Sequence, residues 1–99
     1  SAIKNKQCVI IIPVYKTYLE EYEIASMIQL VNTVGNEYDI CLVCPDGLYI
    51  NYYNNICNYK FNYLKCNSEY FKSIYTYSEL LENYNFYEAF RQYEYMMIY

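Results

Sequence analysis

Residues 8–14 read CVIIIPV, and this apolar run decides the fold class of the chain. Most of its residues are β-branched, and such side chains pack well on a pleated sheet. A run without polar alternation is typical of a strand that is buried on both faces, as in a parallel sheet covered by helices. The sequence therefore predicts a central strand over Cys8–Val14, bounded by Pro13.

The segments that follow alternate between helical and strand patterns. Apolar residues at nearly helical spacing predict a helix over Leu19–Val34, with Thr17 as its N-cap and Gly35 at its end. Tyr38–Cys44 has the pattern of a second buried strand. It stops at Pro45-Asp46-Gly47, which is a strong turn signal. One strand–helix–strand unit thus occupies the first half of the chain.

The second half continues the alternation. Its expected elements are a short helix over Leu48–Asn58, a strand over Phe61–Cys66, a loop or helical turn over Ser68–Tyr75, a helix capped by Ser78 that breaks at Asn83-Tyr84-Asn85 and resumes over Phe86–Arg91, and a strand over Tyr93–Tyr99. The order β-α-β-α-β-α-β predicts one α/β domain over residues 1–99, with a parallel sheet, right-handed crossovers and helices on both faces. Ligands of such sheets bind beyond the carboxyl ends of the strands.

Charge and hydropathy disfavour several classes of partner. The net charge is −4, and the seven lysines and arginines are dispersed, so neither nucleic acid nor an anionic membrane is expected to bind through a basic patch. No apolar run approaches the roughly 20 residues of a spanning helix, and no signal peptide is visible. We expect a cytoplasmic location, with peripheral attachment to the inner face of the membrane left open for the intact protein.

The five cysteines are expected to be free thiols, because their number is odd and no secretion signal is visible. Cys41 and Cys44 have the spacing of a redox motif, but they lie in an apolar strand pattern. Side chains three apart on a strand point to opposite faces, so this pair cannot close a disulfide or chelate one metal. With no histidine in the chain, we interpret the cysteines as small buried hydrophobic residues.

The 17 tyrosines are open to two interpretations. They could form an aromatic surface that binds sugars or bases. Alternatively, they reflect a genome rich in A and T, whose codons favour Tyr, Asn, Ile and Lys. Because the tyrosines are spread from Tyr15 to Tyr99 and do not cluster, the genomic explanation is the better one.

Asp46 is the best candidate for contact with a ligand. A carboxylate at the carboxyl end of a strand can accept hydrogen bonds from both hydroxyls of a ribose or from the imide of a uracil, and Gly47 lets the backbone come close. The alternative is that Asp46-Gly47 is only a good turn. No glycine-rich phosphate loop follows the first strand, which lowers the odds for P-loop and dinucleotide-binding enzymes. Lys16 could meet a phosphate or simply be solvated.

The order of these motifs resembles the start of a glycosyltransferase of the GT-A type. Ile11-Ile12-Pro13-Val14-Tyr15 resembles the opening of family 2 glycosyltransferases, where the backbone after the first strand flanks the nucleotide base. Val43-Cys44-Pro45-Asp46-Gly47 is similar to the motif of the second strand, although many members have another acid in place of Pro45. Asn83 followed by Ala89 matches an Asn-x5-Ala pattern before the fourth strand. Residues 77–99 look closer still to a bacterial group related to the DUF5672 glycosyltransferase-like proteins.

The resemblance implies a Rossmann-like sheet that forms the N-terminal half of a GT-A fold. It also implies a nucleotide-diphosphate sugar as donor, with a UDP-sugar as first choice, and a sugar or glycan acceptor in the synthesis of a surface polysaccharide or glycoconjugate. The implied nucleotide-binding residues are Pro13, Val14, Tyr15, Asp46, Gly47 and Asn83. No catalytic or metal-binding residue is expected within residues 1–99.

The chain stops inside the expected fourth strand, so we expect a longer enzyme with further functional residues beyond Tyr99. In that enzyme, Mn²⁺ or Mg²⁺ would be held by acids beyond Tyr99. The exposed edge of Tyr93–Tyr99 invites self-association. The alternatives are a nucleotidyltransferase and a small binding module that is receiver-like or flavodoxin-like. A nucleotidyltransferase would need a basic, glycine-rich first loop, a receiver an acidic cluster, and a flavin module a Ser/Thr/Gly-rich phosphate loop.

Overall fold

The computed structural model describes residues 5–99 of the protein and shows one sheet of four parallel strands. The strands are β1 (Asn5–Pro13), β2 (Tyr38–Pro45), β3 (Asn62–Cys66) and β4 (Tyr95–Ile98), and their order across the sheet is β3-β2-β1-β4. The prediction of an α/β fold with a parallel sheet is confirmed, and the strand order is compatible with a Rossmann-like fold.

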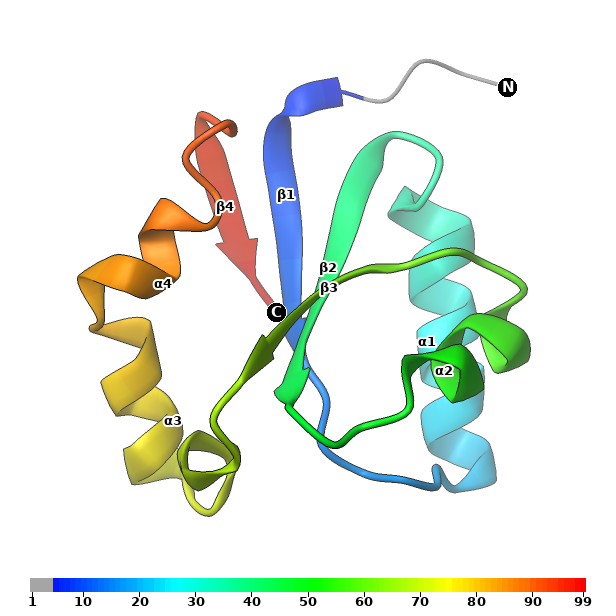
Figure 1. The fold of residues 1–99 in the computed structure, drawn as a ribbon. Helices are drawn as coiled ribbons and strands as arrows, with labels where there is room; N and C mark the ends of the chain where they lie inside the picture. Colours follow the sequence, from blue (N-terminus) through cyan, green and yellow to red (C-terminus); the bar gives the residue numbers. More distant parts are fainter. Residues whose placement is uncertain (1–4) are drawn as a thin grey trace.

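Helices cover both faces of this sheet, as Figure 1 shows. On one face lie α1 (Glu21–Val34) and α2 (Ile50–Cys57), and on the other lie α3 (Ile74–Leu81) and α4 (Tyr84–Glu88). The steps from β1 to β2 and from β2 to β3 run in one direction across the sheet. The step from β3 to β4 runs back over the opposite face, so all three crossovers have the same hand.

The strand side chains alternate between two hydrophobic clusters. Ile10, Ile12, Ile40, Leu42 and Cys44 pack under α1 and α2. Their neighbours in the sequence, including Val9, Ile11 and Val43, pack under α3 and α4. The apolar runs of β1 and β2 are continuous because their side chains are buried on both faces, as predicted for a sheet covered by helices on both sides.

The third crossover contains the expected kinds of element, but its helices begin at other residues than predicted. A 3-10 turn, η1 (Ser68–Phe71), follows β3, within the stretch expected to be a loop or a helical turn. Helix α3 begins after Ser73, whereas the predicted N-cap was Ser78. Ser73 is the N-cap because its Oγ accepts from the backbone N–H of Thr76 at 3.2 Å, while the Thr76 hydroxyl oxygen accepts from the Ser73 N–H at 3.0 Å. Ser78 lies inside the helix and donates its hydroxyl to the carbonyl of Ile74.

The predicted N-cap of α1 is also wrong. The helix begins at Glu21, and the backbone N–H of Glu20 donates to Oε1 of Glu23 at 3.0 Å, so Thr17 is not the N-cap. The end of the helix is confirmed, since the Gly35 N–H donates to the carbonyl of Val31 at 2.8 Å. Side-chain oxygens one turn into a helix compete well for the free N–H groups at its start.

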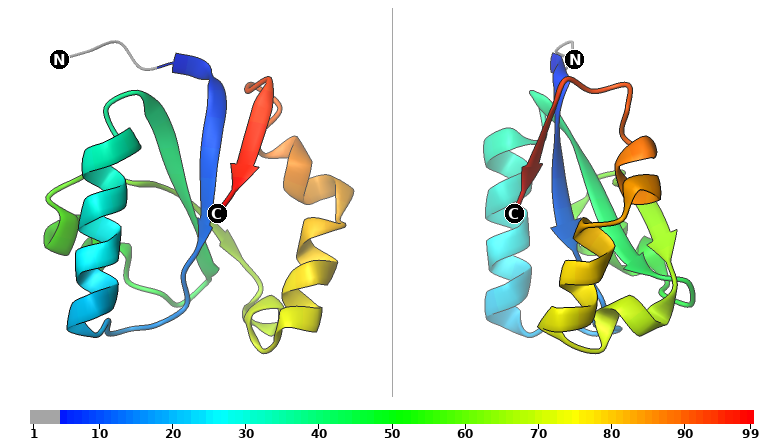
Figure 2. Two further views of the ribbon diagram at one scale, coloured as in Figure 1. Left: turned by 180° about the vertical axis from the view of Figure 1, so that it is seen from behind. Right: turned by 90° about the vertical axis from the view of Figure 1, so that its left-hand side faces the viewer.

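Strand β4 lies at one edge of the sheet, beside β1 (Figure 2). It is shorter than the predicted Tyr93–Tyr99, because Tyr93 and Glu94 precede it and Tyr99 follows it. Its outer edge has no strand partner among residues 5–99, and Tyr95, Met97 and Ile98 are exposed. Self-association through this strand stays a prediction. None of the helices in the described part of the chain has the length and apolar content needed to cross a membrane.

Candidate functional site

The carboxyl edge of the sheet gathers most of the residues predicted to bind a nucleotide. Pro13 is the last residue of β1, and the Val14 N–H extends the pairing by donating to the carbonyl of Val43 at 2.9 Å. Val14 is buried under α1 and α2, so it can offer only its backbone to a ligand. Tyr15, the next residue, is 59% exposed.

A cavity of about 320 Å³ lies where β1 ends, and its lining is mostly apolar. Pro13 and Tyr15 form one wall, and the segment from Phe71 to Ile74 forms another, together with Tyr77. This volume is at the lower end of the range of small-molecule sites. The cavity lies at the carboxyl end of β1, and ligands of open α/β sheets bind beyond the carboxyl ends of the strands.

The wall formed by η1 and α3 was not predicted from the sequence. It brings Lys72, whose ammonium pairs with Glu69 at 2.9 Å, and the N-cap Ser73 to the cavity. The Tyr77 hydroxyl is buried and makes no hydrogen bond within the described residues; burial, and then the neighbouring Cys66, raises the pKa of this phenol. The Ser73-x-x-Thr76 pattern is the signal in the sequence that could have located the start of α3 here.

Asp46 and Gly47 follow β2 at the same edge, as the central residues of a β-turn closed by a 3.1 Å hydrogen bond from the Leu48 N–H to the Pro45 carbonyl. Both residues are exposed. No protein atom lies within 4 Å of the position that a Cβ of Gly47 would take. The turn therefore presents a carboxylate and open backbone next to the end of β1, since β1 and β2 are neighbouring strands.

Asn83 lies apart from this edge. It is the N-cap of α4, and its side-chain oxygen accepts from the backbone N–H of Asn85 at 2.8 Å. In Figure 1, α3 runs away from the carboxyl edge before the chain reaches α4. The structure thus places Pro13 and Tyr15 in the wall of the cavity and Asp46 and Gly47 after the neighbouring strand at the same edge, outside the cavity lining, whereas Asn83 has a capping role.

Lys16 is engaged with the protein and is not simply solvated. Its ammonium forms an ion pair with Glu23 at 2.8 Å. The hydrogen bond to Glu23 raises the pKa of Lys16, and the same bond lowers the pKa of Glu23. A phosphate at this position would have to compete with the carboxylate of Glu23.

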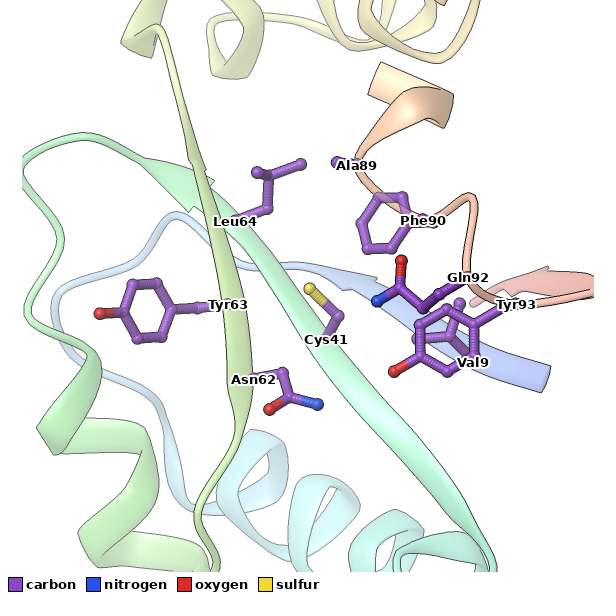
Figure 3. A pocket seen from close by; sticks show the side chains of 9 residues that line it. All are labelled: Val9, Cys41, Asn62, Tyr63, Leu64, Ala89, Phe90, Gln92 and Tyr93. Carbon is purple, nitrogen blue, oxygen red and sulfur yellow. The ribbon is translucent and has the colours of Figure 1, made fainter. Parts of the chain in front are cut away.

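A second cavity of about 310 Å³ lies on the α4 face of the sheet (Figure 3). In the figure, Phe90, Gln92 and Tyr93 stand over Cys41 of β2, while Tyr63 points to the other side of β3. The Tyr93 hydroxyl donates to Oδ2 of the buried Asp39 at 2.5 Å, and burial, and then this bond, raises the pKa of Tyr93. Among the described residues, no Asp, Glu, Lys or Arg lines this second cavity, so we assign no acid–base chemistry to it.

The prediction that the cysteines are buried is confirmed for Cys41 and Cys44, whereas Cys8, Cys57 and Cys66 are half-buried. Cys41 packs under α3 and α4, Cys44 packs under α1 and α2, and all five cysteines are free. Burial raises the pKa of the Cys41 thiol to about 12 and that of the Cys44 thiol to about 11. These thiols stay protonated near neutral pH, so they are not nucleophiles.

Within residues 5–99 no three or more Cys, Asp or Glu side chains converge into a possible metal site. The divalent cation that the resemblance implies therefore does not fit the side chains of this part of the chain. Comparison of the chain with protein-family models, with curated proteins and with solved structures gave no match. The assignment of function depends on the geometry of the carboxyl edge and on the motifs that lie there.

Proposed function

We propose that the carboxyl edge binds the nucleotide of a nucleotide-diphosphate sugar, with a UDP-sugar as first choice, and that the protein is the donor-binding part of a glycosyltransferase. The observation that carries this proposal is the cavity between the end of β1 and the start of α3. It lies at the point where ligands of open parallel sheets bind, beside the residues of the motif that ends β1.

The residues at this edge suit the parts of a nucleoside. The exposed ring of Tyr15 offers a face on which a base can stack. The carboxylate of Asp46 can accept from the ribose hydroxyls or the uracil imide, and the open space at Gly47 admits a ligand close to the backbone. A role for Asn83 in binding rests on the resemblance alone.

The intact glycosyltransferase would need a sugar or glycan acceptor and, by the resemblance, Mn²⁺ or Mg²⁺ held outside the described residues. We place the activity in the cytoplasm, in the synthesis of a surface polysaccharide or glycoconjugate, and leave open whether the intact protein attaches peripherally to the inner face of the membrane. The five free thiols support this location, because disulfides are rare there.

Asp46→Ala is expected to weaken the binding of UDP by about 1–3 kcal/mol, the usual effect of losing a charge-assisted hydrogen bond. Isothermal titration calorimetry would measure the affinity. An NMR titration of the wild-type protein should show that the amide signals of Tyr15 and Gly47 shift with UDP.

Glu37→Ala is the matched control, because Glu37 is also an exposed acid but precedes β2, at the opposite edge of the sheet. It should leave the affinity unchanged. Equal affinity of the wild-type, Asp46→Ala and Glu37→Ala proteins, all folded by circular dichroism, would return Asp46 to the role of a turn residue.

The 99-residue protein is expected to bind UDP weakly, with little dependence on Mn²⁺, and to transfer no sugar. The candidate acids lie apart: Asp46 follows β2, Glu69 pairs with Lys72 in η1, and Glu94 precedes β4 at the other edge. Calorimetry with and without EDTA, and a donor-hydrolysis assay, would check this. Sugar transfer that EDTA abolishes would show a metal site that the side chains of residues 5–99 do not reveal.

A further inference from the structure

The loop from Val14 to Glu20 joins β1 to α1 and is fixed along its inner side. It starts from the β-type hydrogen bond of Val14 and ends at the backbone N–H of Glu20, which donates to Glu23 at 3.0 Å. Leu19 is buried in the core between these points. Connecting loops are usually the more mobile parts of a domain, so this degree of anchoring calls for an explanation.

Two adjacent tyrosines of α2 supply the middle anchors. The Tyr53 hydroxyl donates to the backbone carbonyl of Lys16, and the Tyr52 hydroxyl oxygen accepts from the backbone N–H of Leu19 at 2.8 Å. Tyr53 is fully buried, and the two rings meet edge to face with their centroids 5.4 Å apart. The two phenols therefore bond to two sites of one loop, from positions more than thirty residues away along the chain.

The outer side of the same loop carries exposed aromatic rings. Tyr15 is 59% exposed and Tyr18 is 70% exposed. The bonds of the inner side fix the backbone on either side of Tyr15, from Val14 to Lys16, while its ring faces the cavity at the carboxyl edge. An aromatic side chain on a fixed backbone loses less conformational entropy when it binds a ligand.

We propose that Tyr52 and Tyr53 are positioning residues that hold the β1–α1 loop and thereby preorganise Tyr15 for the base of the nucleotide. This inference rests on the proposed function, since it concerns the same site. Codon usage in an A/T-rich genome explains the number of tyrosines, whereas this inference gives two of them a specific role. Neither residue touches the cavity, so both act through the loop.

The test compares Tyr52→Phe and Tyr53→Phe with Tyr59→Phe. The control is closely matched, because the Tyr59 hydroxyl also donates to a backbone carbonyl, that of Gly35 at 3.0 Å, but at the end of α1 remote from the cavity. All three variants keep the ring and lose one phenolic oxygen. The global stability of each, from urea unfolding, sets the baseline for the two local measurements.

The first measurement is made without a ligand. Amide hydrogen exchange of Leu19 should become about two- to tenfold faster in Tyr52→Phe, beyond any change expected from global stability, because the N–H loses its acceptor. The carbonyl ¹³C signal of Lys16 should shift in Tyr53→Phe and stay in place in Tyr59→Phe. Exchange and shifts that match those of the control would overturn the role of these phenols as anchors.

The second measurement is the affinity for UDP. Tyr52→Phe and Tyr53→Phe should each weaken binding about two- to tenfold, whereas Tyr59→Phe should bind as the wild-type protein does. A freed loop with unchanged affinity would overturn the positioning role while the proposed function stands. Failure of the wild-type protein to bind UDP would overturn the proposed function, and the positioning role with it, whatever the exchange data show about the anchors.

Discussion

Phe86→Ala is expected to lower the free energy of unfolding by about 3–5 kcal/mol, the usual loss for a buried aromatic residue. Phe86 is the buried residue of α4, a helix of five residues that is too short to be stable alone. Its ring lies edge to face with that of Phe90, with the centroids 5.3 Å apart. Without it, α4 loses its buried side chain, and Phe90 alone is buried in the chain from there to β4. Urea unfolding followed by circular dichroism would measure the loss.

Tyr84→Ala is the control for this prediction, because Tyr84 belongs to the same helix but is 74% exposed. This substitution should lower the free energy of unfolding by less than about 1 kcal/mol, since the exposed Tyr84 hydroxyl only donates a hydrogen bond to Glu88. If both variants lost the same free energy, α4 would not be held by burial of Phe86, and the packing described for this face of the sheet would be wrong.

Alkaline pH is expected to destabilise the protein strongly, through its buried thiols. Burial raises the pKa of Cys41 to about 12 and of Cys44 to about 11, whereas an unfolded cysteine titrates near 8.5. A raised pKa means stability that is fully present below the unfolded value and is lost as the pH rises toward the folded value. Between about pH 8.5 and 10.5, each thiol should lower the free energy of unfolding by about 1.4 kcal/mol per pH unit. The two thiols together should therefore lower it by roughly 5 kcal/mol at pH 10.5.

Urea unfolding at pH 7.5, 9 and 10.5, with a reductant present, would measure this dependence. Cys41→Ala and Cys44→Ala should each be less stable than the wild-type protein at pH 7.5, but each should lose less stability as the pH rises. A wild-type stability that stays constant up to pH 10.5 would contradict the burial of these thiols. The phenols Tyr53 and Tyr93 add to the loss above pH 10, since burial raises their pKa as well.

Local sequence patterns predicted the elements better than their ends. The strands and the first two helices lie close to where the patterns placed them, but α1 and α3 begin at caps that were not predicted, and α4 begins at Tyr84, inside the predicted break. Ser78 and Ser73 both precede helix-forming residues. Ser73 is the cap because Thr76 can return the hydrogen bond, and because η1 delivers the chain to that point. A choice between two plausible caps depends on the path of the chain before the helix.

The candidate site could also be predicted only in part, because some of its residues follow strands and others lie in the third crossover. Pro13, Tyr15, Asp46 and Gly47 follow two strands, and the rule that parallel strands end at one edge brings them together. Phe71, Ser73 and Tyr77, which line the cavity opposite Tyr15, come from a crossover whose one local signal, the cap formed by Ser73 and Thr76, was not recognised. The sequence likewise did not reveal that Tyr52 and Tyr53 anchor the β1–α1 loop.

By itself, the sequence determined that the chain forms a parallel sheet covered by helices, because the runs over residues 8–14 and 38–44 are apolar at every or nearly every position, and only burial on both faces stabilises such strands. The tertiary structure alone decided the strand order and the partners of the buried phenols. Tyr53 meets Lys16 across 37 residues, and Tyr93 meets Asp39 across 54. Local patterns record which side chains avoid water, whereas such pairings depend on how distant elements pack against one another.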